Sequence, residues 1–180
     1  MNEPSSDLRP VGANRLVVGP LVGAIEPLSC LLGTWRGAGH GEYPTIDAFE
    51  YGEEMLFEHV GDGFLLSSQQ SWLTLDGSPL HFERGFWRPG SAANEVELTL
   101  AHPLGLTEVA EGRVDAGDDG VTTIEVASVE VGHTRTGMDV VGLERRYRVD
   151  RAVLRYEIDM HTGATPMTRH LTGELQRVDA

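Results

Sequence analysis

The sequence predicts an all-β domain of about ten antiparallel strands, arranged as a sandwich or as a closed up-and-down barrel. Apolar and polar residues alternate over most of the chain, as expected where one face of each strand is buried. Turn motifs rich in Gly, Pro, Asn and Asp separate these stretches. Only one short stretch, 21–32, is compatible with a helix. Many short strands with tight turns and little helix are typical of both architectures.

The N-terminal stretch differs in composition from the rest. Residues 1–18 contain no apolar segment with a basic start, so we expect no secretory signal but a disordered tail before one domain at 19–180. No apolar run approaches the roughly 20 residues of a membrane helix, so we expect no membrane span. The single cysteine, Cys30, cannot form an internal disulfide. That fits a reducing compartment, and we expect a cytoplasmic protein.

The first predicted strand contains an unusual cluster of glycines. The stretch GTWRGAGHGEYPTI at 33–46 places four glycines within nine positions, around Trp35. Glycine inside a strand marks a bulge, a sharp bend or a close approach of the backbone to another group. We expect the strand to bend across one end of a small barrel, near a ligand, with Trp35 plugging one end. The interior of a small barrel is filled by side chains or holds one ligand, as in lipocalin-like proteins.

The remaining strands follow at short intervals. The complete predicted set spans 34–41, 47–59, 63–74, 80–88, 94–102, 105–114, 121–131, 139–149, 152–160 and 168–177. Alternation is clearest in 47–59, 94–102 and 152–160. Their apolar faces carry Phe49, Tyr51, Met55 and Phe57; Val96, Leu98 and Leu100; and Leu154, Tyr156, Ile158 and Met160.

The charge argues against several classes of function. The formal net charge is −14, and every basic residue is an arginine. Such a surface repels phosphate backbones, so no nucleic-acid partner is expected. The sequence also lacks metal-type cysteine spacing, a phosphate-binding loop and heptad repeats.

Four stretches together resemble the nitrobindin family. They are the GxWxGxG and YPTI motifs within 33–46, FEYGEE at 49–54, AHPLGLTEVAEG at 101–112, and the segment from LRYEIDM to TPMTRHL at 154–171. The resemblance covers residues 22–177 and implies a ten-stranded barrel related in shape to fatty-acid-binding proteins. It also implies one haem b per subunit near one barrel end, isomerisation of peroxynitrite to nitrate at the ferric haem, and binding or scavenging of nitric oxide. A homodimer is compatible with the resemblance.

The resemblance also assigns site residues. His170, in MTRHL, matches the axial iron ligand and is the residue on which catalysis would depend. Thr45, in YPTI, matches a residue that contacts the haem. Met160 and Phe49 are expected as apolar haem contacts, together with Ile46. His81, in PLHFERG, matches a histidine on the distal side, where it would bind a water or oxyanion, exclude solvent, or simply face water.

The residues themselves leave alternatives to this assignment open. Strict alternation places His170 on the more polar face of its strand, so its role rests on the family motif. His161 is the rival ligand, although its position after Met160 suggests an exposed loop. His102 is expected to be buried near the pocket in a structural role. Arg169 stands where several family members carry proline, and it would meet a haem propionate or point to water.

Three functions compete at this point. The first is the haem enzyme, and the second is an intracellular carrier of a small apolar ligand in the same barrel, without functional haem. The third is an interaction domain with a filled interior and an acidic surface. A ligand-sized cavity would separate the first two from the third, and haem absorbance would separate the first from the second.

Overall fold

The computed structural model describes residues 23–59 and 63–178. The expected disordered tail at 1–18 therefore lies outside the described residues. A 3-10 helix, η1 (Gly23–Leu31), precedes ten strands. The strands are β1 (Gly33–Tyr43), β2 (Ile46–His59), β3 (Leu65–Leu73), β4 (Pro79–Pro89), β5 (Glu95–His102), β6 (Leu106–Ala116), β7 (Val121–His133), β8 (Val140–Asp150), β9 (Val153–Thr162) and β10 (Thr165–Val178).

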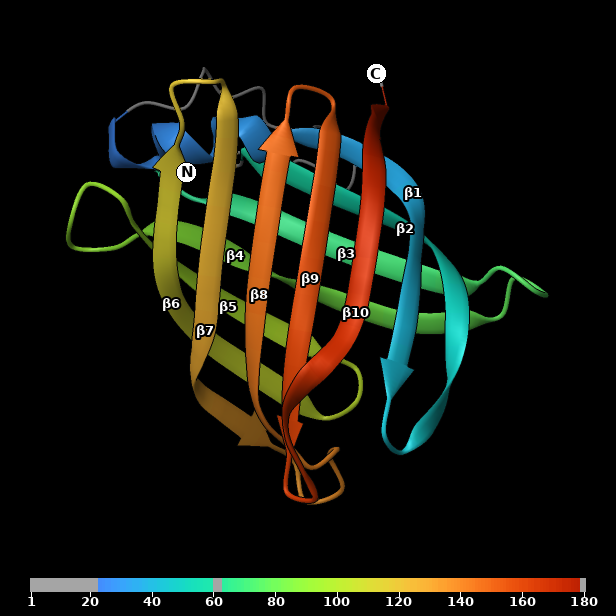
Figure 1. Ribbon diagram of the computed structural model, residues 1–180. Helices are drawn as coiled ribbons and strands as arrows, with labels where there is room; N and C mark the ends of the chain where they lie inside the picture. The colour runs from blue at the N-terminus through green and yellow to red at the C-terminus, as the bar shows by residue number, and fades with distance from the viewer. Residues whose placement is uncertain (1–22, 60–62, 179–180) are drawn as a thin grey trace, which may run out of the picture.

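The ten strands form one closed antiparallel barrel (Figure 1). Each strand pairs with its neighbours in sequence, and β1 closes the ring by pairing with β10 from Thr34↔Val178 to Gly41↔Leu171. The barrel prediction is thus confirmed, and the sandwich is excluded. Full closure leaves no unpaired sheet edge in the ring. The expected strand ends agree with the observed ones to within three residues.

The predicted alternation sets which side chains fill the barrel. The apolar residues expected to face inward from β2, β5 and β9 are buried, apart from Phe49, which is half-buried. Alternation works here because one face of every strand meets the interior and the other meets water.

One end of the barrel is closed by η1 (Figure 1). Trp35 is fully buried, and its indole Nε1–H donates a hydrogen bond of 2.7 Å to the carbonyl of Leu31. The guanidinium of Arg177 lies 4.2 Å from the centre of the Trp35 ring, in cation–π contact. Trp35 therefore plugs this end, as expected. The turns β1–β2, β7–β8 and β9–β10 lie at the opposite end (Figure 1).

The glycines of β1 make room for aromatic rings of the next strand. Gly39 pairs with Tyr51 and Gly41 pairs with Phe49. A Cβ on Gly39 would lie 2.3 Å from the Tyr51 ring, and one on Gly41 would lie 2.2 Å from the Phe49 ring. The sequence predicts a close approach of the β1 backbone to a ligand. In the structure, Gly39 and Gly41 instead approach the Tyr51 and Phe49 rings of the neighbouring strand. A ring laid over a strand glycine stabilises that position and fixes the ring.

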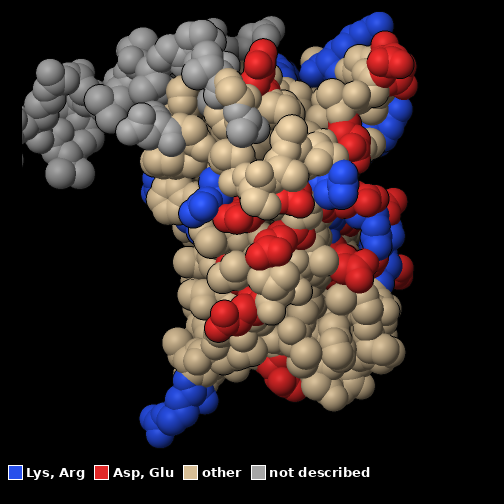
Figure 2. Space-filling view, turned by 90° about the vertical axis from the view of Figure 1, so that its left-hand side faces the viewer, with Lys and Arg blue, Asp and Glu red and all other residues tan. Residues whose placement is uncertain are grey.

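Figure 2 shows one side of the barrel. Acidic and basic side chains are interspersed over its middle and upper parts, whereas its lower end is mostly uncharged. Among the described residues, none of the helices has the length and apolar character needed to cross a bilayer.

We expect Gly39→Ala to lower the free energy of unfolding by about 1–3 kcal/mol, because the new methyl group overlaps the Tyr51 ring and the carbonyl of Thr172. Urea denaturation of the haem-free protein measures this. Gly142→Ala in β8 is the matched control, since the nearest atom to its Cβ would be Met167 Cε at 4.0 Å. Equal stability of the two variants would contradict this account of the cluster.

Candidate functional site

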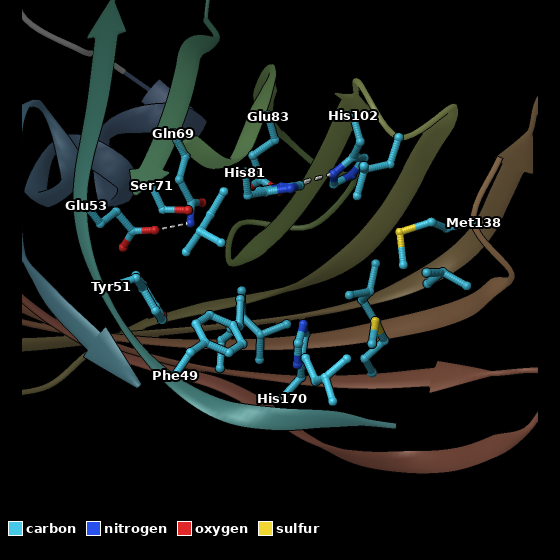
Figure 3. A pocket seen from close by; sticks show the side chains of 18 of the residues that line it. Phe49, Tyr51, Glu53, Gln69, Ser71, His81, Glu83, His102, Met138 and His170 are labelled. Carbon is cyan, nitrogen blue, oxygen red and sulfur yellow. Dashed lines mark hydrogen bonds and ion pairs between the residues drawn. The ribbon is translucent and has the colours of Figure 1, made fainter. Parts of the chain in front are cut away.

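The barrel interior contains a cavity at the end opposite η1 (Figure 3). Its volume is about 440 Å³, within the usual range of small-molecule sites. Apolar side chains dominate its walls, and polar groups gather on β2, β3, β4, β5 and β8. A ligand-sized cavity argues against the interaction domain with a filled interior.

His170 lies near the start of β10, where the pairing with β9 contains a bulge. Arg169 pairs with Asp159 and Leu171 pairs with Ile158, so His170 is an extra residue without a partner on β9. A bulge re-aims side chains away from strict alternation. Both His170 and Leu171 therefore line the cavity.

This bulge corrects the alternation expected from the sequence. Strict parity grouped His170 with Thr172 and Glu174, on the polar face of the strand. In the structure Leu175 is fully buried, as parity predicts for its end of β10. The parity argument fails only beyond the bulge, toward the cavity end, where one additional residue changes which side chains face inward.

Two contacts orient the His170 ring. Its Nδ1 lies 3.1 Å from the backbone carbonyl of Glu42, and the Tyr43 ring packs edge-on at a centroid distance of 5.3 Å. Since a carbonyl only accepts, Nδ1 carries the proton and Nε2 keeps its lone pair. Burial lowers the pKa of His170, an effect that the Glu42 carbonyl partly opposes. The ring is therefore neutral at neutral pH and has a free nitrogen for a metal.

Three other predicted residues share the cavity with His170. Phe49 lies beside His170 in the close-up, Met160 lines the wall formed by β9, and His81 lies on the opposite wall (Figure 3). Ile46 lies at the rim and is half exposed. The structure thus brings together residues from β2, β4, β9 and β10.

Other expected residues lie elsewhere. Thr45 is exposed in the β1–β2 turn, next to the rim but outside the cavity lining. His161 belongs to the end of β9 and not to a loop, and it is absent from the described cavity lining. Arg169 forms ion pairs with Asp159 and Glu157, which occupy its guanidinium.

A buried ion-pair cluster forms the inner wall of the cavity. Arg145 donates to both carboxylate oxygens of Glu83 at 3.1 and 3.2 Å, and to Glu108 at 2.8 Å. Burial is the largest influence and opposes ionisation of both carboxyls, but the charge of Arg145 together with hydrogen bonds from neighbouring side chains outweighs it and holds the pKa of Glu83 and of Glu108 below its ordinary value. Both carboxylates are therefore ionised at neutral pH, and Arg145 is cationic.

Two imidazoles adjoin this cluster. His81 Nε2 lies 3.4 Å from His102 Nδ1, and the rings are 5.4 Å apart (Figure 3). The side chain of His102 is only 5% exposed, which matches the burial expected near the pocket. His81 is more accessible and faces the cavity.

A third buried carboxyl, that of Glu53, lies on β2. The Tyr156 hydroxyl donates to it at 2.6 Å and the Gln69 amide donates to its other oxygen. Burial raises the pKa of Glu53 to about 7, although these hydrogen bonds oppose the shift. The Tyr51 hydroxyl lies 2.6 Å from that of Tyr156 and 3.1 Å from the carbonyl of Thr172, which extends the network to β10.

Sequence reasoning missed the buried charges, although alternation contained the signal. Arg145 shares its strand parity with Leu143 and Tyr147, which are both buried. Glu53 likewise has the parity of Tyr51 and Met55. Charged side chains usually face solvent, whereas the spacing of Arg145 and Glu53 places them on the inward faces of their strands.

Comparison with known proteins now identifies the family. The model of a family described as "THAP4-like, heme-binding beta-barrel domain" matches residues 24–177. The chain belongs to this family. The resemblance that the sequence motifs predicted is thereby confirmed.

Members of the THAP4-like family with high similarity are named after one reaction. Peroxynitrite isomerase 2 of Mycobacterium marinum is 42% identical over 156 residues, 85% of this chain and 94% of the relative. Peroxynitrite isomerase of Nocardia farcinica is 40% identical over 153 residues, 85% of this chain and 90% of the relative. The crystal structure of Rv2717c from M. tuberculosis has a TM-score of 0.83 at 40% identity, covering 88% of this chain and 99% of that one.

The residues present fit a haem. The THAP4-like domain offers a neutral imidazole, His170, inside a cavity with apolar walls, and its Nε2 is free to ligate iron. Phe49, Ile158, Met160 and Leu171 supply flat or flexible apolar surface around it. The cavity lies at the barrel end opposite the η1 plug, where polar haem substituents have access to water.

We expect Glu53→Gln to stabilise the haem-free protein in a pH-dependent way. The unfolded carboxyl releases its proton near pH 4.5, whereas the folded one keeps it to about 7, so wild-type stability falls as pH rises through this window. Glutamine has no titratable proton, so the Glu53→Gln variant does not lose stability as the pH rises through this window. The advantage of Glu53→Gln over wild type should be about 2 kcal/mol larger at pH 8 than at pH 5.

Urea denaturation at the two pH values measures this, with Glu125→Gln on the exposed side of β7 as the control for charge. An equal effect of Glu53→Gln at both pH values would show that the buried carboxyl does not hold its proton.

Proposed function

We propose that this protein is a peroxynitrite isomerase that uses one haem b per subunit, with His170 as the axial iron ligand. The observation that carries the proposal is the β10 bulge, which turns a neutral imidazole with a free Nε2 into an apolar cavity. The family is haem-binding, and relatives over 90% or more of their length are named peroxynitrite isomerases.

The chain supplies binding and orientation. His170 would ligate the iron, while the Glu42 carbonyl and the Tyr43 ring fix the orientation of the imidazole. Phe49 and Met160 would contact the macrocycle. A strand in a closed barrel is a rigid mount for such a ligand.

Polar groups outside the cavity lining have separate proposed roles. Thr45 in the β1–β2 turn remains a proposed haem contact at the rim. Arg135 is exposed in the β7–β8 turn, close in sequence to the cavity residue Met138, and would meet a propionate. Arg169 is a weaker candidate for that role because Asp159 and Glu157 already bind its guanidinium.

Peroxynitrite is an anion, and the wall opposite His170 offers donors for it. The bound haem supplies a Lewis-acidic iron. His81 is the imidazole on that wall with most access to the cavity, and we assign it the hydrogen bond to the incoming anion. The apolar walls would limit water around the reactants and would favour their reaction inside the cavity over escape from it.

Three further features belong to this proposal. Nitric oxide would bind at the same iron, because it requires no contact beyond the open coordination position. We also propose a cytoplasmic location, which fits the single cysteine, and a homodimer as the assembly. These features rest on sequence and resemblance.

A carrier of another small apolar ligand is the alternative function. The apolar lining of the cavity favours it, since apolar walls hold many ligands of that size. A carrier would not require the hydrogen bond by which the Glu42 carbonyl orients the His170 ring.

We expect titration of the purified protein with hemin to give one equivalent of bound haem with a sharp Soret band. His170→Ala should weaken haem binding at least about 100-fold and broaden the band, because the axial ligand is lost. Peroxynitrite decay, followed by stopped-flow absorbance, should fall to the rate of free hemin in this variant. His161→Ala is the matched control, as its side chain belongs to the neighbouring strand but not to the cavity lining.

An unchanged spectrum in His170→Ala would disprove the axial assignment. A protein that shows no specific haem band, yet binds a fluorescent fatty acid in the cavity, would support the carrier.

A further inference from the structure

Three potential ligand atoms on neighbouring strands converge on the cavity wall opposite His170. His81 Nε2 lies 3.3 Å from Glu83 Oε2, His102 Nδ1 lies 3.5 Å from the same oxygen, and the two nitrogens are 3.4 Å apart. By these distances the three atoms form a nearly equilateral triangle, and the contact between His81 and His102 is the dashed line in Figure 3. His81 and Glu83 come from β4, and His102 comes from the end of β5.

This triangle has the dimensions of a tetrahedral metal site. Ligand atoms about 2.1 Å from a zinc ion at the centre of a tetrahedron lie about 3.4 Å from one another. Two imidazoles and one carboxylate are also an established ligand set for zinc with an open fourth position. No movement of the backbone is needed to bring these three atoms to the required separation.

The surroundings of His102 leave one nitrogen without a partner. Its Nε2 is buried and has no hydrogen-bond partner within the part of the chain that the structure describes. The nearest carboxylate oxygen is Oε2 of Glu108, at 3.8 Å. A metal on Nδ1 would place the proton on Nε2, facing that carboxylate. This is the carboxylate–histidine–metal arrangement common in zinc proteins.

The local charge also favours a cation. Glu83 and Glu108 carry two negative charges, and Arg145 between them carries one positive charge. These three groups together carry one excess negative charge, in a buried environment where such an excess is costly. A divalent ion would offset it.

We propose that His81, Glu83 and His102 form a second metal site that binds zinc, separate from the axial residue His170. All three residues line the cavity, so the open fourth position faces its interior and accepts a water molecule or a small anion. The site shares His81 with the proposed haem reaction, in which this ring would hydrogen-bond the incoming anion. Metal binding does not depend on haem, because none of the three ligands holds the haem iron.

The test uses the full-length, haem-free protein titrated with Co²⁺, whose visible absorption is strong in tetrahedral sites. We expect one equivalent to bind with intense visible bands, and Zn²⁺ to displace it. His81→Ala and His102→Gln should each weaken Co²⁺ binding at least about 100-fold. Glu83 is left intact, because its loss would strand the buried charge of Arg145.

Two matched variants separate this site from other binding. His40→Ala removes an exposed imidazole that contacts Glu50 at 2.7 Å, and it should leave Co²⁺ binding unchanged. His170→Ala should lose haem but keep the cobalt spectrum. Failure of the haem proposal and failure of the metal proposal are thereby distinguishable.

A second measurement does not rely on the variants folding. In ¹H–¹⁵N spectra of the wild-type histidine rings, Zn²⁺ should shift the signals of His81 and His102 but not those of His40 and His161. Weak octahedral cobalt bands, binding lost with His40→Ala, binding retained in His102→Gln, or unshifted His81 and His102 signals would each overturn the proposal.

Discussion

The ion pairs of Arg145 are the interaction on which the interior of this barrel depends. One guanidinium from β8 joins carboxylates from β4 and β6 across the lumen, and its side chain is only 2% exposed. Removing one member of a buried ion pair costs several kcal/mol, since the remaining charge loses its partner inside a medium of low polarity. The cluster therefore joins three strands that are not all neighbours in the ring.

This cluster, together with Glu53, also forms the inner wall of the cavity, where the cavity meets the packed core. Glu53 and Arg145 line the cavity, whereas Met55 and Tyr147, the next inward residues on the same strands, belong to the filled core. The barrel thus has a packed half next to η1 and an open half at the other end.

The chemistry of the open half depends on departures from regular strand geometry. A single bulge in β10 turns His170 inward. The closed barrel is rigid, and within it the Glu42 carbonyl and the Tyr43 ring fix the orientation of the imidazole. The opposite wall carries His81, Glu83 and His102 on β4 and β5, where Arg145 binds Glu83. A ligand in the cavity therefore meets the Nε2 lone pair of His170 on one side. On the other side it meets the two histidines His81 and His102, next to the carboxylate of Glu83.

Period-two alternation and turn residues act locally and the family motifs are specific, so the strands, most of their inward faces and the family are predictable from the sequence. The axial role of His170 stays a prediction that rests on the family motif. The alternation also places Arg145 and Glu53 on the inward faces of their strands. A buried charge, however, can be predicted only when the group that pairs with it is known. Other features are visible only in the tertiary structure. Glu83 and Glu108 bind Arg145, and the Tyr51 and Phe49 rings cover glycines of β1. The inward turn of His170 is a further example. Each depends on the register between strands distant in sequence, and a bulge changes that register by one residue without a mark in the local pattern.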